Sequence, residues 1–173
     1  MKPRRNQKTA DDIIRRHKSG YSDFRNVFVD AEDLSKRRLF GINFDGATLA
    51  GCNFSQSYLK QANFNAANLR NVNFKGADLS KAILTGADLR GAVLREANLS
   101  GADLRYANLE GVNLAGANIS AANFEGTNLT QANLKDANPG KLWWKARLAD
   151  ARLDGAVLPD GTVFGQPAAG RVD

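Results

Sequence analysis

An apolar residue recurs at every fifth position of the chain from Phe24 to Leu134, without a break. The 23 residues of this series are almost all Leu or Phe, and the series ends at Pro139. An α-helix repeats every 3.6 residues and a β-strand every two, so neither element alone produces a sustained period of five. The sequence therefore predicts stacked repeats of a solenoid, ahead of any argument from residue propensities.

Each unit of five residues has a fixed pattern, whose positions we call small, polar, central, variable and corner. In the 20 units centred on residues 44 to 139, the small position is Ala in 14 and the polar position is Asn or Asp in 16. A short strand that turns its small and central residues inward accounts for these two preferences. Asn, Asp and the frequent corner Gly favour tight turns, because they supply local hydrogen bonds and left-handed backbone. Four such segments would close into a square coil, with successive coils about 4.8 Å apart.

This pattern resembles the pentapeptide-repeat family, and the resemblance covers residues 22–141 as 24 uninterrupted units. It implies an all-β solenoid, specifically a right-handed quadrilateral β-helix of about six to seven coils. The layout, in which a helix precedes uninterrupted repeats, is similar to that of stand-alone bacterial members of the family. A leucine-rich helical repeat is the structural alternative, but it needs a longer period and tolerates far fewer Asn and Gly residues.

The N-terminal end, residues 1–21, is predicted to be a basic leader with a capping α-helix at residues 9–20. Thr9 followed three residues later by Asp12 resembles a capping box, and Ser19-Gly20 is a typical helix end. The apolar residues of this segment, which are expected to cover the first coil, are Ile13, Ile14 and Tyr21.

The C-terminal end departs from the regular repeat. The five-residue phase slips by one residue after Pro139-Gly140, and apolar centres resume at Leu148, Leu153 and Leu158. We therefore expect a phase-shifted terminal coil and cap at residues 142–165 and a flexible tail at residues 166–173. Trp143 and Trp144 lie in the slip, where they either cover the last full coil or form an oligomer interface.

The net charge of +6 is concentrated at the N-terminus. Residues 1–21 carry a balance of +5, whereas residues 22–165 carry only +1. The single Cys52 excludes an intramolecular disulfide and fits a reducing compartment. The N-terminus has no apolar core of a secretory signal, and no stretch has the roughly 18 apolar residues of a transmembrane helix. A cytoplasmic protein without a transmembrane segment is the expectation.

The sequence offers no catalytic constellation. His17 is the only histidine and is expected on the solvated side of the cap, while Cys52 stands at a small position and is expected in the core. Asp78, Asp88 and Asp103 occupy polar positions, which indicates turn residues and not catalytic acids. One histidine and one cysteine do not make an ordinary zinc site. We expect no catalytic site, no metal, no cofactor and no small-molecule substrate.

Possible partner contacts are apolar residues at positions that should face water. Tyr58, Ile83 and Val93 replace Asn or Asp at polar positions. Tyr106 belongs to the coil after Ile83 and to the same side, so this pair is the first candidate for a partner-contact patch. Trp143 and Trp144 complete the set of possible contact residues.

The function hypothesis is a non-catalytic scaffold that binds an unidentified protein through its outer surface, as a monomer or as a homodimer through one end of the solenoid. One alternative is an interaction with DNA gyrase or topoisomerase of the quinolone-resistance type. Relatives of that type imitate DNA, which needs a strongly negative rod, and the repeat body at +1 does not provide one. Another alternative is contact with nucleic acid or an anionic membrane through the basic N-terminal arm, although nucleic acid is not expected as the partner.

Overall fold

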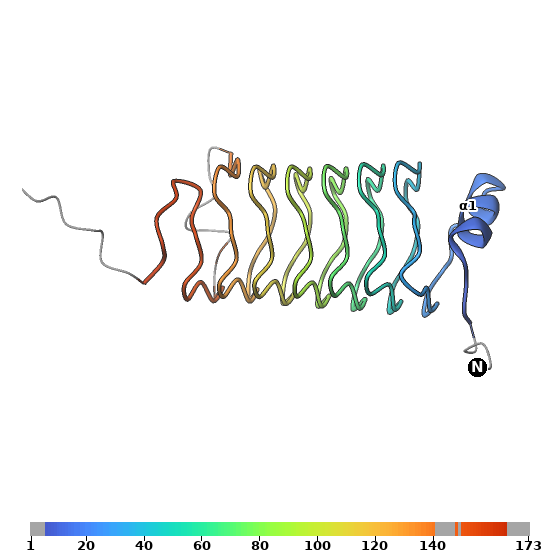
Figure 1. Cartoon of the computed structure of the whole chain (residues 1–173), viewed down its shortest axis with the longest axis horizontal. Coiled ribbons are helices and arrows are strands. Elements are labelled where there is room, and N and C mark those ends of the chain that lie inside the picture. The colour runs from blue at the N-terminus through green and yellow to red at the C-terminus, as the bar shows by residue number, and fades with distance from the viewer. Residues whose placement is uncertain (1–5, 141–147, 149, 166–173) are drawn as a thin grey trace, which may run out of the picture.

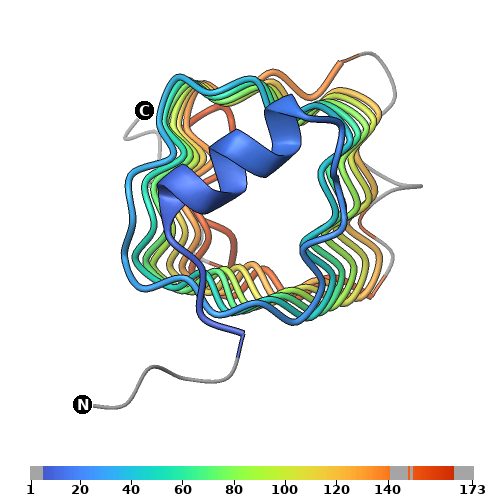
Figure 2. The same ribbon diagram turned by 90° about the vertical axis from the view of Figure 1, so that its right-hand side faces the viewer.

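The computed structural model describes residues 6–140, 148 and 150–165. They form an elongated tube of stacked coils that is covered at one end by helix α1 (Ala10–Lys18) (Figure 1). Along the tube axis the coils superimpose into a square outline (Figure 2). Apart from α1, the regular structure of these residues consists of isolated β-bridges, most of which are parallel and join polar positions 20 residues apart, from Asp23–Asn43 to Asn118–Asn138. Four units of five therefore make one coil, as the sequence predicts.

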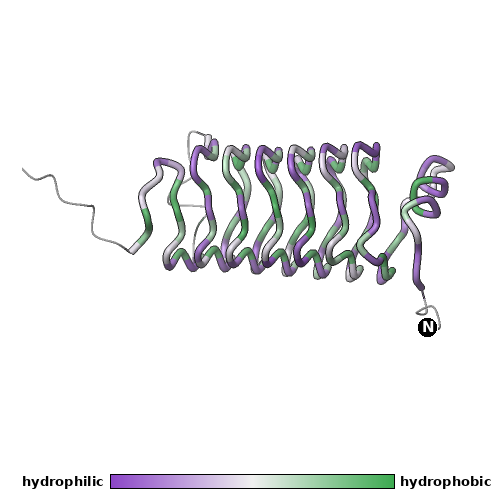
Figure 3. The backbone as a smooth tube through the Cα atoms, viewed as in Figure 1, coloured by the Kyte–Doolittle hydropathy of each residue, from purple (hydrophilic) through white to green (hydrophobic). Residues whose placement is uncertain are grey.

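Residues separated by 20 stack on the same outer surface, so the tube has four walls, each beginning in the first coil. Wall 1 begins with residues 22–26, wall 2 with residues 27–31, wall 3 with residues 32–36 and wall 4 with residues 37–41. Each wall continues with the residues 20 positions later in every following coil as far as residue 140, and residues 150–165 join the walls with a register of 24. Figure 3 shows that apolar and polar residues recur at matching places in successive coils.

The interior of the tube is filled by the central and small residues. All 23 central residues from Phe24 to Leu134 are at most 2% exposed, and the Ala residues of the small positions are buried beside them. Phenylalanine rings of adjacent coils stack inside the tube, with ring centroids 5.6 Å apart for Phe44 and Phe64 and 5.3 Å apart for Phe54 and Phe74. Each such side chain contributes about 1.5–3 kcal/mol of burial free energy, so the stacked core is the main stabilising term.

The hydrogen bonds of one unit explain why the polar position prefers Asn or Asp. In residues 77–81 the N–H of the small residue donates to the carbonyl of the preceding central residue, and the N–H of the polar residue donates to a carbonyl of the previous coil. The N–H groups of the central and corner residues donate to carbonyls of the next coil. Only the N–H of the variable residue, Ser80, lacks a backbone acceptor, and it donates to Asp78 Oδ1 at 3.0 Å. All 18 Asn and Asp residues at polar positions from Asp23 to Asn138 accept this bond. The preference therefore satisfies a backbone donor that the coil leaves unpaired.

The corner position has left-handed backbone in every unit from Asn26 to Asp136, which makes 23 corners with positive φ. Only ten of these corners are Gly. A left-handed backbone costs a residue with a Cβ roughly 1–2 kcal/mol, so the stacked coils impose this geometry on the other 13 residues.

Helix α1 has the ends that the sequence predicts. Thr9 Oγ1 accepts a hydrogen bond from Asp12 N–H at 3.2 Å. At the other end, Tyr21 N–H donates to Arg16 O, Gly20 N–H donates to His17 O, and φ of Gly20 is +89°. These bonds form a Schellman motif. Of the three predicted covering residues, Ile13 is buried, Ile14 is partly buried against the core and Tyr21 is exposed.

The leader also supplies an edge strand that the sequence did not indicate. Lys8 N–H donates to Phe28 O at 2.9 Å, and Phe28 N–H donates to Asn6 O at 3.2 Å. Residues 6–8 thus pair with the first coil at wall 2, where the open edge of the tube would otherwise expose backbone groups. Glu32 Oε2 accepts a hydrogen bond from Ala10 N–H at 3.4 Å, which joins the start of α1 to wall 3.

At the C-terminal end the register between coils widens from 20 to 24 residues, as in the Asn128–Arg152 and Asn133–Val157 bridges. Leu153 is buried and Leu148 packs against the core, so the phase shift predicted after Pro139 leads into further coil structure. Val157 then pairs antiparallel with Val163, which covers the edge of wall 3. Trp143 and Trp144 lie outside the described residues.

Candidate partner-contact surface

In the repeat body, the fold itself accounts for the surroundings of Cys52, Asp88 and Asp103. Cys52 is buried, and this burial raises the pKa of its thiol to about 11, so the thiol stays protonated at neutral pH. The guanidinium of Arg90 binds Asp88 through two hydrogen bonds of 2.9 and 2.7 Å, and these bonds hold the pKa of Asp88 below its usual value. Arg105 lowers the pKa of Asp103 in the same way. Both carboxylates are already used by the turn and the ion pair.

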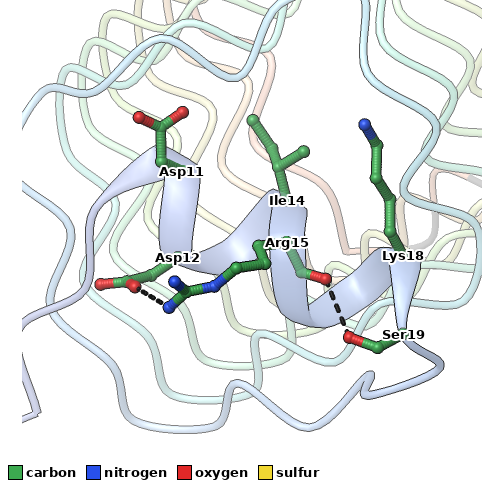
Figure 4. A pocket seen from close by; sticks show the side chains of 6 residues that line it. All are labelled: Asp11, Asp12, Ile14, Arg15, Lys18 and Ser19. Atoms are coloured by element: carbon green, nitrogen blue, oxygen red, sulfur yellow. Dashed lines mark hydrogen bonds and ion pairs between the residues drawn. The ribbon is translucent and has the colours of Figure 1, made fainter.

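The outer surface of α1 has an open pocket of about 570 Å³, lined only by residues of the helix and its C-cap (Figure 4). Asp12 is paired there with Arg15 at 2.8 Å, and Ser19 Oγ donates to Arg15 O at 2.9 Å. His17, for which the sequence predicts a solvated position, is half-buried, and its Nδ1 atom is shielded without a hydrogen-bond partner. These groups do not place a nucleophile next to a base, so the pocket gives no indication of catalysis.

Neither a metal cluster nor a membrane-spanning helix occurs in the part of the chain that the structure describes. Its residues include no cluster of three or more His, Cys, Asp or Glu side chains that could bind a metal ion. They also form no helix of sufficient length and hydropathy to cross a bilayer.

The four predicted contact residues that the structure describes lie on three different walls. Tyr58 is half-buried on wall 4, and Val93 is half-buried on wall 3. Ile83 and Tyr106 are both on wall 1, where Ile83 is 43% exposed and Tyr106 is 63% exposed. Among the four candidates that the structure describes, only Ile83 and Tyr106 therefore share a wall, and their role as a contact patch stays a prediction.

The ring of Tyr106 has a defined position on the corner between walls 1 and 2. Tyr106 has a left-handed backbone with φ of +59°. Its ring lies over Gly126 in the next coil, so that a Cβ added to Gly126 would be 2.6 Å from Tyr106 Cδ1. The absence of a side chain at Gly126 thus makes room for an exposed aromatic ring that points towards the C-terminal end.

An aromatic pair on wall 4 was not predicted from the sequence. Phe40 is 49% exposed and stacks on Tyr58, with ring centroids 6.2 Å apart and an interplanar angle of 20°. The guanidinium of Arg38 lies 5.8 Å from the centroid of the Tyr58 ring, within cation–π range. Phe40 occupies a variable position, whereas Tyr58, Ile83 and Val93 are candidate contacts because they are apolar at polar positions. The signal that could have revealed the pair is the separation of 18 residues, which places a variable position beside the polar position of the next coil.

Charge also distinguishes wall 4 from the other walls. Among the described residues, wall 4 carries Arg37, Arg38, Lys60 and Lys81 against Asp78 alone, a balance of +3. Wall 1 has a balance of −3, and walls 2 and 3 have −1 each. In its described residues the near-neutral repeat body therefore has one basic wall, which the total charge conceals.

The family model described as pentapeptide repeats matches eight copies within this chain, over residues 38–76, 73–111 and 107–138. These matches cover more than half of the chain. The chain belongs to the pentapeptide-repeat family. Pentapeptide-repeat proteins adopt right-handed quadrilateral β-helices, with which the square coils agree, and they are in general structural or interaction proteins without catalysis.

Solved structures of other pentapeptide-repeat proteins are similar to this chain. Rfr23 from the cyanobacterium Cyanothece 51142 is 31% identical, with 73% of this chain and 90% of that chain covered and a TM-score of 0.43. A pentapeptide-repeat protein of the Arabidopsis thaliana thylakoid lumen is 40% identical, with coverages of 60% and 68% and a TM-score of 0.30. QnrB1, a plasmid-mediated fluoroquinolone resistance protein, is 25% identical in a trypsin-treated form, with coverages of 75% and 81% and a TM-score of 0.34. The chain has no match among curated protein sequences.

Proposed function

We propose that this protein is a non-catalytic scaffold, a tube of about six to seven coils whose outer walls bind a partner protein in the cytoplasm. The observation that carries the proposal is the filled interior, in which all 23 central residues are at most 2% exposed. A tube packed in this way offers ligands only its walls and its ends. Extended flat walls suit a protein surface better than a small molecule, which needs a concave site.

Ile83 and Tyr106 on wall 1 are the proposed contact patch of this scaffold. A large aromatic ring and an aliphatic side chain are both exposed there, and rings of this kind are frequent anchors at protein interfaces. The Tyr106 ring lies over Gly126, and this packing on one side would reduce the side-chain freedom that is lost on binding.

The charge distribution favours this scaffold over the gyrase alternative. A DNA mimic needs about one negative charge per 1.7 Å of its length. In the described residues the four walls instead carry balances between −3 and +3, and wall 4 is basic at its N-terminal end. Inhibition of gyrase supercoiling by a stoichiometric amount of this protein would support the alternative.

Affinity capture from the native host tests the scaffold, with the full chain as bait and Tyr106→Ala/Ile83→Asn as the patch variant. We expect a reproducible set of captured proteins that the patch variant retains poorly. Equal capture by both baits would refute the proposed contact patch but not the scaffold function. An empty capture after chemical cross-linking would refute the scaffold function itself.

A further inference from the structure

The N-terminal part of wall 4 has an exposed surface of aromatic and basic residues that lies apart from the Ile83 and Tyr106 patch. Arg38, Phe40, Tyr58, Lys60 and Lys81 lie there on three successive coils, and we call them the basic-aromatic patch. Arg38 and Tyr58 are joined by a parallel bridge, and Gly41 N–H donates to Lys60 O at 3.0 Å, so Phe40 and Lys60 are also neighbours.

The basic groups of this patch are free of the ion pairs that occupy arginines elsewhere. On the other walls, Arg25, Arg90 and Arg105 each bind an Asp two residues earlier at 2.7 Å. Within the described residues, wall 4 has no ion pair. The one acidic group among them on this wall, Asp78, already accepts hydrogen bonds from Ser80 N–H and from Asn98 Nδ2.

The basic surface continues from wall 4 onto α1. Ser22 O accepts a hydrogen bond from Asn43 N–H, so the chain that leaves α1 lies directly above the corner between walls 4 and 1. Arg16 stacks on the Tyr21 ring there, with its guanidinium carbon 4.0 Å from the ring centroid. In Figure 2 the helix crosses the tube opening diagonally, so its basic last turn ends beside the same corner.

We propose that the basic-aromatic patch is a docking surface for an acidic protein segment that also carries an apolar side chain. This inference rests on the proposed scaffold function and names the chemistry of its partner. Unpaired cations at the edges of the patch would hold carboxylates, and the exposed face of Phe40 would take the apolar side chain. Complementary charge of this kind sets the association rate and partner choice, and it makes binding sensitive to salt.

The rest of wall 4 limits the docking site to one end. In the following coils its outward positions are occupied by Asn98, Ser100, Asn118 and Ser120, which are uncharged. The partner segment is therefore expected to end, or to lose its acidic character, beyond Lys81.

The test uses the full chain and a fluorescein-labelled Glu-rich peptide that contains one Phe, with fluorescence anisotropy as the measurement. The wall 4 variant is Arg38→Glu/Lys60→Glu, and the matched control is Lys75→Glu/Arg95→Glu on wall 3, which reverses the same number of charges. We expect the wall 4 variant to bind at least about tenfold more weakly than the wild type, a loss of about 1.4 kcal/mol. The wall 3 variant should stay within about twofold, and high salt should abolish binding.

Phe40→Ser tests the apolar contact, with an expected few-fold loss of affinity at the low salt concentration at which the wild type binds. Lys60→Glu/Lys81→Glu replaces the wall 4 variant if circular dichroism shows that substitution of Arg38 disturbs the fold. The proposal is overturned if the wild type does not bind the peptide, if the two double variants weaken binding equally, or if a peptide with Gln in place of every Glu binds as well. Tighter binding of a thymidine oligonucleotide that competes with the peptide would assign the patch to nucleic acid and also overturn the proposal.

Affinity capture separates this proposal from the scaffold function. If the wall 4 variant captures the same proteins as the wild type, the docking surface is refuted and the scaffold remains. If the peptide binds wall 4 but cross-linked capture from the host is empty, the patch chemistry is correct and the scaffold function fails.

Discussion

Alanine at Gly126 should destabilise the tube through two separable effects. Gly126 has φ of +64°, and a left-handed backbone costs an alanine about 1 kcal/mol relative to glycine. The new Cβ would also lie 2.6 and 2.7 Å from two carbons of the Tyr106 ring. The ring would have to leave its place over the corner, and the van der Waals packing that it gives up is worth about 1 kcal/mol.

Gly86 provides the matched control, because it is the corresponding corner of another coil in the same stack. Its φ is +65°, but a Cβ added there meets no atom within 4 Å. Gly86→Ala should therefore lower the melting temperature by about 2–4 °C and Gly126→Ala by about 4–8 °C, at the usual scale for chains of this size. Thermal melts followed by circular dichroism measure both shifts.

The double variant Tyr106→Ala/Gly126→Ala isolates the ring contact. In the Tyr106→Ala background, Gly126→Ala should cost no more than Gly86→Ala does in the wild type, because only the backbone effect remains. Equal shifts for the two glycine variants in the wild type, or an excess for Gly126→Ala that survives removal of Tyr106, would contradict the described position of the ring.

Three further predictions concern the wall turns, the core and the ion pairs. Asn73→Ala should lower the free energy of unfolding in urea by about 1 kcal/mol, because the Lys75 N–H loses its acceptor. Asn73→Asp keeps the acceptor and should be nearly neutral. Equal losses for the two variants would disprove the role of the turn bond. Leu104→Ala should cost about 2–5 kcal/mol, because Leu104 is fully buried in the stack, and a loss below about 1 kcal/mol would show that it is not. The pKa of Asp88 is lowered in the folded state by Arg90, so its contribution to stability is present above the unfolded value of 3.8 and is lost as the pH falls through the folded value. Melting temperatures between pH 2 and 7 should therefore decline more steeply for the wild type than for Asp88→Asn, and parallel profiles would refute this coupling.

The sequence was sufficient to predict the repeating part of the fold. A period of five with two inward positions leaves one consistent register, so the burial of Leu104 and the turn role of Asp88 both follow from position in the unit. The left-handed backbone at Ala66 or Tyr106 was less apparent, because neither residue favours it. There the stack of coils overrides local preference.

The sequence predicts the capping helix and the phase shift after Pro139. The strand pairings that close the two ends could not be predicted, because they follow no period. Residues 6–8 contain no apolar pattern, and their pairing with Phe28 depends only on the backbone groups that the first coil leaves open. The antiparallel pairing of Val157 with Val163 likewise follows from an exposed edge and a turn at Gly161, and not from the repeat.

The candidate surfaces show how function can be located in a solenoid of this kind. Once the coil length is known, residues that touch across adjacent coils can be found in the sequence at separations near 20. Phe40 and Tyr58, for example, are 18 residues apart and pair a variable position with a polar position. Single substitutions in the repeat are weak signals, because an isolated exposed apolar residue needs no explanation. Two or three exposed apolar substitutions at such separations are neighbours on adjacent coils. If unpaired charges of one sign surround them, they form a surface that the neighbouring coils hold rigid. That combination occurs at the N-terminal end of wall 4. We therefore expect the partner to bind this patch, because a few local contacts and not the net charge of the chain provide the binding free energy.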